Sequence, residues 1–240
     1  MNPAVGAPKA GDVPGQRSPF QGLGFYTEDD AKWFFGRTVE RKVILAHLRT
    51  APLTVLYAES GVGKSSLLRA GVAARLRELA ARTSAGGRAP RFVPVVFSAW
   101  KDDPVQDLIA EIDRQASPMM PAAAPASNGG GPERASALVP DPAPTGLADA
   151  IRRAAAALDA TLVIILDQFE EHFSYRIGAR DPDRVADELA RCIRSSDVPA
   201  NFLIAVREDA YGRLGDLFGG RIANVYDNYL HLEYLSREAA

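Results

Sequence analysis

Short runs of consecutive hydrophobic residues alternate along the chain with longer stretches in which hydrophobic residues recur every three or four positions. Short apolar runs are typical of strands buried on both faces, and the wider spacing is typical of amphipathic helices. Such alternation predicts an α/β fold with a parallel sheet covered by helices on both faces. The predicted strands span residues 52–57, 91–97, 161–166, 201–206 and 225–232. The predicted helices span residues 28–33, 39–49, 64–81, 104–115, 147–158, 183–194 and 208–218.

Two stretches of the chain lack hydrophobic periodicity. Residues 1–19 are rich in proline, glycine and alanine, and residues 116–146 are dense in proline, alanine, serine and glycine. Segments of this composition bury too little apolar surface to offset the entropy lost on ordering. We therefore predict a disordered leader over 1–19 and one domain over 20–240, interrupted by a flexible insertion at 116–146.

Composition and charge exclude several classes of protein. Hydrophobic residues make up 47% of the chain, which is enough for one sizeable core. The net charge is −2, so no overall basic field indicates a nucleic-acid partner. The best apolar run, residues 162–166, is far too short to span a bilayer, and the N-terminus lacks a signal-peptide pattern. The single cysteine, Cys192, cannot form an internal disulfide and fits a helix core position, so a reduced, cytoplasmic setting is the simplest inference.

The sequence AESGVGKS at residues 58–65 lies between the first predicted strand and the helix that follows it. Gly61 and Gly63 allow the backbone to wrap closely around phosphate oxygens, and the helix N-terminus adds a favourable dipole. Lys64 is expected to reach the β- and γ-phosphates of a nucleotide, and the Ser65 hydroxyl to bind Mg²⁺. The simpler alternative is a glycine turn at the start of an ordinary helix. The predicted nucleotide-binding residues of this segment are Glu59, Ser60, Gly61, Val62, Gly63, Lys64, Ser65 and Ser66.

The helix after this loop carries an apolar stripe on one face. Four arginines fall mostly on the other side, namely Arg69, Arg75, Arg77 and Arg82. A solvated helix face is the simplest interpretation of these arginines.

Acidic residues follow the third predicted strand. Asp167 ends this strand, at the edge where open α/β sheets bind their ligands, and is the expected partner of Mg²⁺. Glu170 or Glu171 would orient and deprotonate an attacking water. Alternatively, both glutamates are solvated charges at the start of a helix, stabilised by its dipole.

Arg207 follows the fourth predicted strand in the same way. In a sheet of this class that strand lies between the two strands that carry the other motifs. The guanidinium is then expected to contact the γ-phosphate and to sense its presence. The alternative is a surface ion pair with Glu208 or Asp209.

Together these residues resemble the STAND class of P-loop NTPases, and within it the bacterial novel STAND group. The resemblance runs from about residue 20 to the C-terminus. It rests on FQGL at 20–23, FFGR at 34–37 followed by Glu40, SGVGKSSLLRAG at 60–71, WKDDP at 100–104, LDQFEE at 166–171 and VRED at 206–209. Each motif is short, and only their combination is specific.

The resemblance implies a five-stranded P-loop NTPase core with strand order 5-1-4-3-2. It implies ATP more than GTP, because the segment of Gly36 and Arg37 lies near the adenine end of the site in such proteins. It also implies a nucleotide-controlled signalling switch. Such proteins continue into a helical lid, a winged helix and a repeat-built sensor, whereas this chain stops where the lid would begin. We therefore expect either a fragment or a reduced form.

Three functions fit these observations. The leading one is an ATPase switch in which ATP and ADP favour different arrangements of domains or protomers, with effector or sensor domains in a longer chain as partners. The second is a scaffold in which nucleotide supports the fold without hydrolysis. The third is a kinase that uses Arg176, Arg180 or Arg184 in a mobile lid, although the spacing of Asp167 and the two glutamates fits a hydrolase better.

Overall fold

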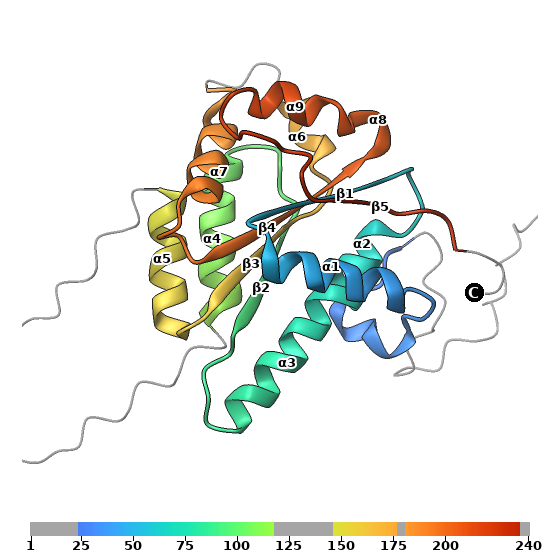
Figure 1. Ribbon diagram of the computed structural model, residues 1–240, viewed down its shortest axis with the longest axis vertical. Coiled ribbons are helices and arrows are strands. Elements are labelled where there is room, and N and C mark those ends of the chain that lie inside the picture. Colours follow the sequence, from blue (N-terminus) through green and yellow to red (C-terminus); the bar gives the residue numbers. More distant parts are fainter. Residues whose placement is uncertain (1–23, 118–145, 177–180, 236–240) are drawn as a thin grey trace, which may run out of the picture.

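Five parallel strands form one central sheet in a computed structural model that describes residues 24–117, 146–176 and 181–235 (Figure 1). The strand order is β2-β3-β4-β1-β5. This order confirms the predicted 5-1-4-3-2 arrangement, counted from the opposite edge. Residues 1–23, which hold the predicted leader and the FQGL motif, lie outside the described residues. So do nearly all of the predicted insertion and Arg180. The strands are β1 (Leu53–Ala58), β2 (Phe92–Phe97), β3 (Thr161–Leu166), β4 (Ala200–Arg207) and β5 (Tyr229–His231).

Helices cover both faces of the sheet (Figure 1). Alternate residues of β3 point to opposite sides, so Ile164 belongs to one buried cluster and Ile165 to the other. One face packs against α4 (Pro104–Ala116), α5 (Leu147–Leu158), α7 (Arg184–Arg194) and α9 (Arg213–Phe218). The other packs against α1 (Thr38–Thr50) and a long helix composed of α2 (Lys64–Ser66), η2 (Leu67–Ala73) and α3 (Ala74–Ala85). The other helices of the described residues are short, namely η1 (Glu28–Trp33), α6 (Glu170–Tyr175) and α8 (Glu208–Tyr211).

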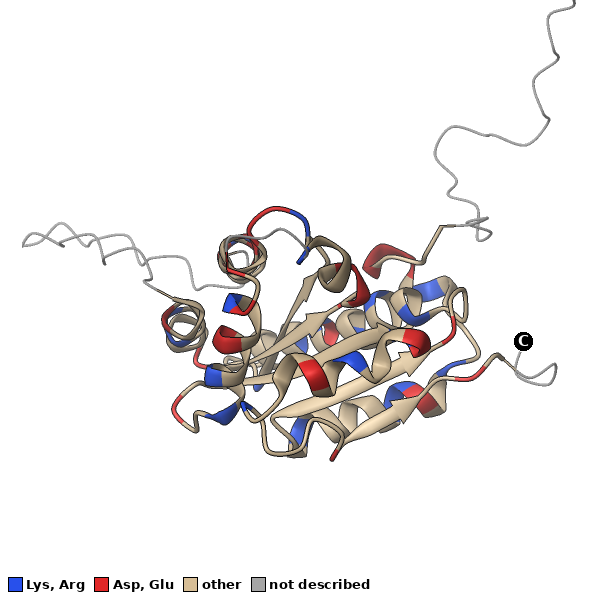
Figure 2. Cartoon of the chain, turned by 90° about the horizontal axis from the view of Figure 1, so that it is seen from above, with Lys and Arg blue, Asp and Glu red and all other residues tan. Residues whose placement is uncertain are grey.

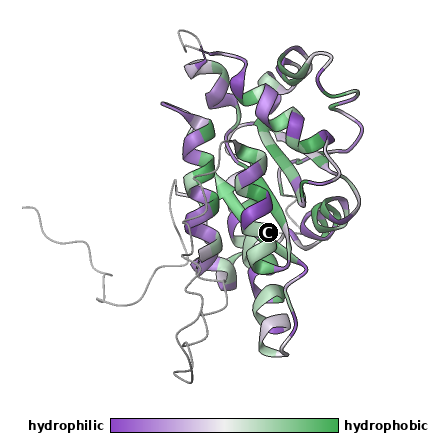
Figure 3. Ribbon diagram, turned by 90° about the vertical axis from the view of Figure 1, so that its left-hand side faces the viewer, coloured by the Kyte–Doolittle hydropathy of each residue, from purple (hydrophilic) through white to green (hydrophobic). Residues whose placement is uncertain are grey.

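Charged and hydrophobic residues are distributed as expected for a sheet between two layers of helices. Charged residues lie mainly on the helices and loops (Figure 2), and the most hydrophobic segments are the strands and the helix sides that face them (Figure 3). Cys192 is buried among the helices of the first face, as predicted, and burial raises the pKa of its thiol to about 12. Within the described ranges, every helix is too short or too polar to cross a bilayer.

The structure differs from the predicted elements at several points, and it adds α6, a helix outside the predicted ranges. The long helix continues to Ala85 instead of ending near residue 81, and its η2 segment is a π-helix. The predicted helix at 208–218 divides at Gly212 into α8 and α9. The predicted fifth strand shortens to three residues, because Val225 turns into the core instead of joining the sheet.

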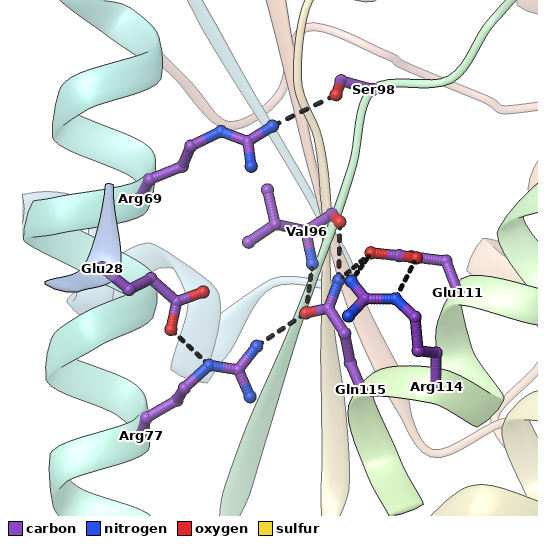
Figure 4. A network of polar contacts seen from close by, with 8 residues as sticks. All are labelled: Glu28, Arg69, Arg77, Val96, Ser98, Glu111, Arg114 and Gln115. Carbon is purple, nitrogen blue, oxygen red and sulfur yellow. Dashed lines mark hydrogen bonds and ion pairs between the residues drawn. The ribbon is translucent and has the colours of Figure 1, made fainter. Parts of the chain in front are cut away.

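On the outer edge of β2, the backbone N–H and carbonyl of Val96 form hydrogen bonds with a side chain instead of with a neighbouring strand. Gln115 of α4 accepts a hydrogen bond from the Val96 N–H at 3.1 Å and donates one to the Val96 carbonyl at 2.8 Å. Arg77 of α3 also donates to the Gln115 carbonyl oxygen at 2.6 Å, and pairs with Glu28 of η1 (Figure 4). This network joins helices from both faces of the sheet around its edge.

Replacing Gln115 with alanine is expected to lower the free energy of unfolding by about 1–3 kcal/mol. The substitution leaves the buried N–H and carbonyl of Val96 without partners, which costs this order of energy. Urea unfolding monitored by circular dichroism would measure the change. Gln106→Ala, on an exposed position of the same helix, is the matched control, and equal effects of the two variants would contradict this role of Gln115.

Candidate functional site

The glycine loop connects β1 to the long helix, as the sequence predicts. Gly61 and Gly63 have φ values of +81° and +96°, which lie in the left-handed region. A Cβ atom added to either glycine would meet no atom within 4 Å, so backbone conformation and not crowding favours glycine at both positions. Gly63 directly precedes Lys64, the first residue of α2. The loop therefore places the N-terminus of a helix at the carboxyl edge of the sheet.

Lys64 folds back against the loop. Its ammonium group donates hydrogen bonds to the Ala58 carbonyl at 2.9 Å and to the Glu59 carbonyl at 3.0 Å. Partial burial lowers the pKa of Lys64, and the nearby carboxylates of Glu170 and Asp167 oppose this shift. The cation is thus held inside the loop and close to two acidic side chains.

Ser65 and Asp167 come together from different elements. The Ser65 hydroxyl donates to Oδ1 of Asp167 at 3.1 Å, and the backbone N–H of Gln168 donates to the same oxygen at 3.0 Å. The indole N–H of Trp100 donates to the Asp167 carbonyl at 2.8 Å and fixes the end of β3. Burial raises the pKa of Asp167, and Arg69 and Ser65 oppose the shift. A hydroxyl and a carboxylate are hard oxygen ligands, and this pair fits the donor set that Mg²⁺ prefers.

Arg69 corrects the prediction of a solvated arginine face. Its Nε lies 3.5 Å from Oδ2 of Asp167, and its side chain is only 23% exposed. Its Nη2 donates to the Ser98 hydroxyl at 3.1 Å, and its guanidinium lies 5.0 Å from the centre of the Phe25 ring. Arg75 and Arg82, by contrast, form exposed ion pairs with Glu78. The side of the helix that holds Arg69 faces the strand ends instead of solvent.

Glu170 and Arg207 meet at the ends of β3 and β4. Oε2 of Glu170 accepts a hydrogen bond from the backbone N–H of Arg207 at 3.2 Å. Burial raises the pKa of Glu170, while Lys64 opposes the shift. The Arg207 side chain is 46% exposed and pairs with Asp209, its Nε donating to Oδ1 at 2.9 Å. The ion pair that was the alternative for Arg207 is therefore present.

Lys64, Ser65, Asp167, Glu170 and Arg207 line one pocket at the carboxyl edge of the sheet. Predicted site residues that do not line it include Glu171 and Arg37. Gln168 was not predicted and has a φ of +54°, which is uncommon outside glycine. Only its position beside Asp167 could have indicated it. The pocket is lined by Gly24, Phe25, Ser60, Gly61, Gly63, Lys64, Ser65, Ser66, Asp167, Gln168, Glu170 and Arg207.

Arg37 contacts the backbone of the glycine loop but does not line the pocket. Its guanidinium is buried, donates to the Val62 carbonyl at 3.1 Å and pairs with Glu40 at 2.7 Å. Ser66 accepts a hydrogen bond from the Tyr26 N–H at 3.1 Å, which ties the segment before η1 to the start of the long helix. Ser66 thus lines the pocket as predicted, whereas Arg37 contacts the loop from outside the residues that line it.

Solved structures share this fold at low sequence identity. A Walker-type ATPase of Pyrococcus abyssi matches with a TM-score of 0.51 and 18% identity, over 87% of this chain and 56% of that one. The ORC2 protein of Aeropyrum pernix, solved in ADPNP–ADP complexes, matches with a TM-score of 0.52 and 15% identity, over 82% of this chain and 47% of that one. The chain thus spans about half the length of the solved structures that it matches. A search of curated protein sequences gave no match.

The family comparison agrees with the fold and with the loop. The sequence model of the novel STAND NTPase 1 family matches residues 19–239, which is nearly the whole chain. The match includes the glycine loop, the end of β3 and the end of β4. The chain therefore belongs to the novel STAND NTPase 1 family and is a nucleotide-binding NTPase domain.

Proposed function

We propose that this chain is the ATP-binding core of a signalling switch that hydrolyses ATP slowly with Mg²⁺. The observation that carries the proposal is the contact between Glu170 and the backbone of Arg207, beside Lys64 in one pocket. A group suited to activating water is thereby linked to a group suited to sensing the γ-phosphate.

Each residue has a distinct part in the proposed reaction. The backbone N–H groups of the loop and Lys64 bind the β- and γ-phosphates. Ser65 and Asp167 hold Mg²⁺, which would supply charge neutralisation at the phosphates. Glu170 accepts the proton of the attacking water, and its raised pKa makes it a better base than an exposed glutamate.

Arg207 would distinguish ATP from ADP. Its guanidinium is half exposed and lines the pocket while pairing with Asp209 of α8. A bound γ-phosphate offers a second anionic partner that ADP lacks. The two nucleotides therefore favour different positions of Arg207 and of α8, which begins at Glu208. We propose that a second protomer or further domains of a longer cytoplasmic chain detect this difference.

The proposal also covers the limits of the domain and the segment near the adenine. The domain extends over 20–240 with an insertion at 116–146, and the segment of Gly36 and Arg37 lies near the adenine end of the site. A kinase is less well supported, because Arg176 and Arg184 pair with Asp183 and Asp103 and do not line the phosphate pocket. A scaffold without catalysis remains the alternative.

Two measurements test the switch. Phosphate release under single-turnover conditions is expected at a rate well below the roughly 10 s⁻¹ typical of enzymes. The molecular mass in solution, measured by light scattering, is expected to differ between the ADP-bound chain and the chain with a non-hydrolysable ATP analogue. Absence of phosphate release would favour the scaffold, and phosphoryl transfer to an added acceptor would favour the kinase. If the mass is unchanged, the isolated chain does not switch by self-association.

A further inference from the structure

We propose that Arg69 is a positioning residue for the Mg²⁺ site, which holds one oxygen of Asp167 so that the other oxygen faces Ser65. This inference rests on the proposed Mg²⁺–nucleotide site and assigns that site a further residue. Arg69 itself lies outside the group of residues that line the phosphate pocket.

The two oxygens of Asp167 have different partners. Oδ1 accepts hydrogen bonds from the Ser65 hydroxyl and from the Gln168 N–H, whereas Oδ2 lies 3.5 Å from Nε of Arg69. Ser65 and Arg69 are four residues apart and therefore lie on the same side of one helix. The Asp167 side chain is only 2% exposed, so little solvent competes with these partners. The carboxylate is thus held at both ends by one helix.

Arg69 is itself held by two other segments. Its Nη2 donates to Ser98, which directly follows β2 (Figure 4), and its guanidinium lies near the Phe25 ring. Its Nε is buried and has no hydrogen-bond partner among the described residues, so the contact with Asp167 is an ion pair without a hydrogen bond. Among the described residues no other acceptor competes for Nε, so this nitrogen is available to the Asp167 carboxylate.

The geometry matters because Mg²⁺ requires near-ideal octahedral coordination at short distances. A carboxylate that rotates freely presents its oxygens in many directions, and a fixed carboxylate presents one. Partners that orient a metal ligand typically contribute about 10–100-fold to metal affinity. Loss of Arg69 should therefore weaken Mg²⁺ binding more than it weakens nucleotide binding without metal.

The test measures binding instead of turnover. Binding of a fluorescent ADP analogue is titrated with Mg²⁺, and again in EDTA, for the wild type, Arg69→Ala, Arg69→Lys and Arg75→Ala. Arg75 lies on the same long helix in an exposed ion pair and is the matched control. Arg69→Ala is expected to raise the Mg²⁺ concentration at half-saturation about 10-fold. Its affinity in EDTA should stay within about 2-fold of the wild type, because metal-free binding does not involve Asp167.

Arg69→Lys keeps the positive charge without the planar fork and is expected to give an intermediate shift. A thermal melt shows whether Arg69→Ala folds. If it does not, Arg69→Lys still tests the inference. Equal shifts for Arg69→Ala and Arg75→Ala, or an equal loss of affinity with and without Mg²⁺, would overturn the inference. If wild-type binding does not depend on Mg²⁺ at all, the proposed metal site fails instead, so the two failures are distinguishable.

Discussion

Replacing Lys64 with alanine is expected to abolish detectable nucleotide binding. The ammonium group is the cation that lies inside the glycine loop, and it would make charge-assisted contacts with two phosphates. Contacts of this kind contribute about 1.5–3 kcal/mol each, so their loss corresponds to a Kd raised by at least about 100-fold. Titration with a fluorescent ATP analogue, in the presence of Mg²⁺, measures the change directly.

The variant also removes two hydrogen bonds from the loop, because Lys64 donates to the carbonyls of Ala58 and Glu59. Glu59 is exposed, so water can replace the hydrogen bond to its carbonyl, and only the bond to the buried Ala58 is lost without a substitute. We therefore expect the fold to survive, and circular dichroism checks this. Lys101→Ala is the control, since Lys101 is exposed and does not line the phosphate pocket. Tight binding by a folded Lys64→Ala variant would show that the loop does not hold the phosphates.

The parallel sheet and its order could be predicted because local signals agree with one another. Each of the first four strands is a short apolar run followed by a helix, and the glycine loop lies between β1 and α2. Pro94 fits this scheme, since β2 lies at the edge of the sheet. The extents of the elements were less predictable, since α3 continues beyond its last buried residue, Ala80, and ends only at Gly86.

The surroundings of Arg69 could not be predicted from helical periodicity. The pattern shows that Arg69 lies away from Leu68 and Val72, and such a position usually faces water. The sequence does not show that this side of the helix passes the ends of β2 and β3. Ser98 and Asp167 end those strands, and they are 29 and 98 positions from Arg69 in the chain. Only the tertiary arrangement brings the three together.

The choice between Glu170 and Glu171 depends on helix phase. Adjacent residues of a helix point about 100° apart, so only one of the two can face the pocket. Phe169 and Phe173 are buried and fix the phase of α6. This places Glu170 beside Lys64 and leaves Glu171 outside the residues that line the pocket. From the sequence alone both glutamates remained candidates, with Glu170 favoured, because the sequence does not reveal which aromatic residues anchor the helix.

Replacing Glu170 with glutamine is expected to slow ATP hydrolysis by at least about 100-fold while nucleotide binding stays within a few-fold of the wild type. General-base catalysis by a positioned carboxylate contributes about 10²–10⁴-fold, and an amide cannot accept the proton. The glutamine carbonyl can still accept the hydrogen bond from the Arg207 N–H, so the link between the two strand ends should persist. Single-turnover phosphate release and a parallel binding titration separate the two effects.

The matched control is Glu171→Gln, which makes the same chemical change one residue away and is expected to leave the rate within about 2-fold. A second signature is the pH dependence of the wild-type rate. Because burial raises the pKa of Glu170 above the ordinary value of 4.5, the carboxylate becomes protonated, and the rate should fall, at a pH above that value. This acidic limb should disappear in Glu170→Gln and remain in Glu171→Gln. If both glutamine variants hydrolyse ATP at the wild-type rate, another group must activate the water. If only Glu171→Gln is slow, α6 must turn when nucleotide binds, since its second glutamate would then have to reach the pocket.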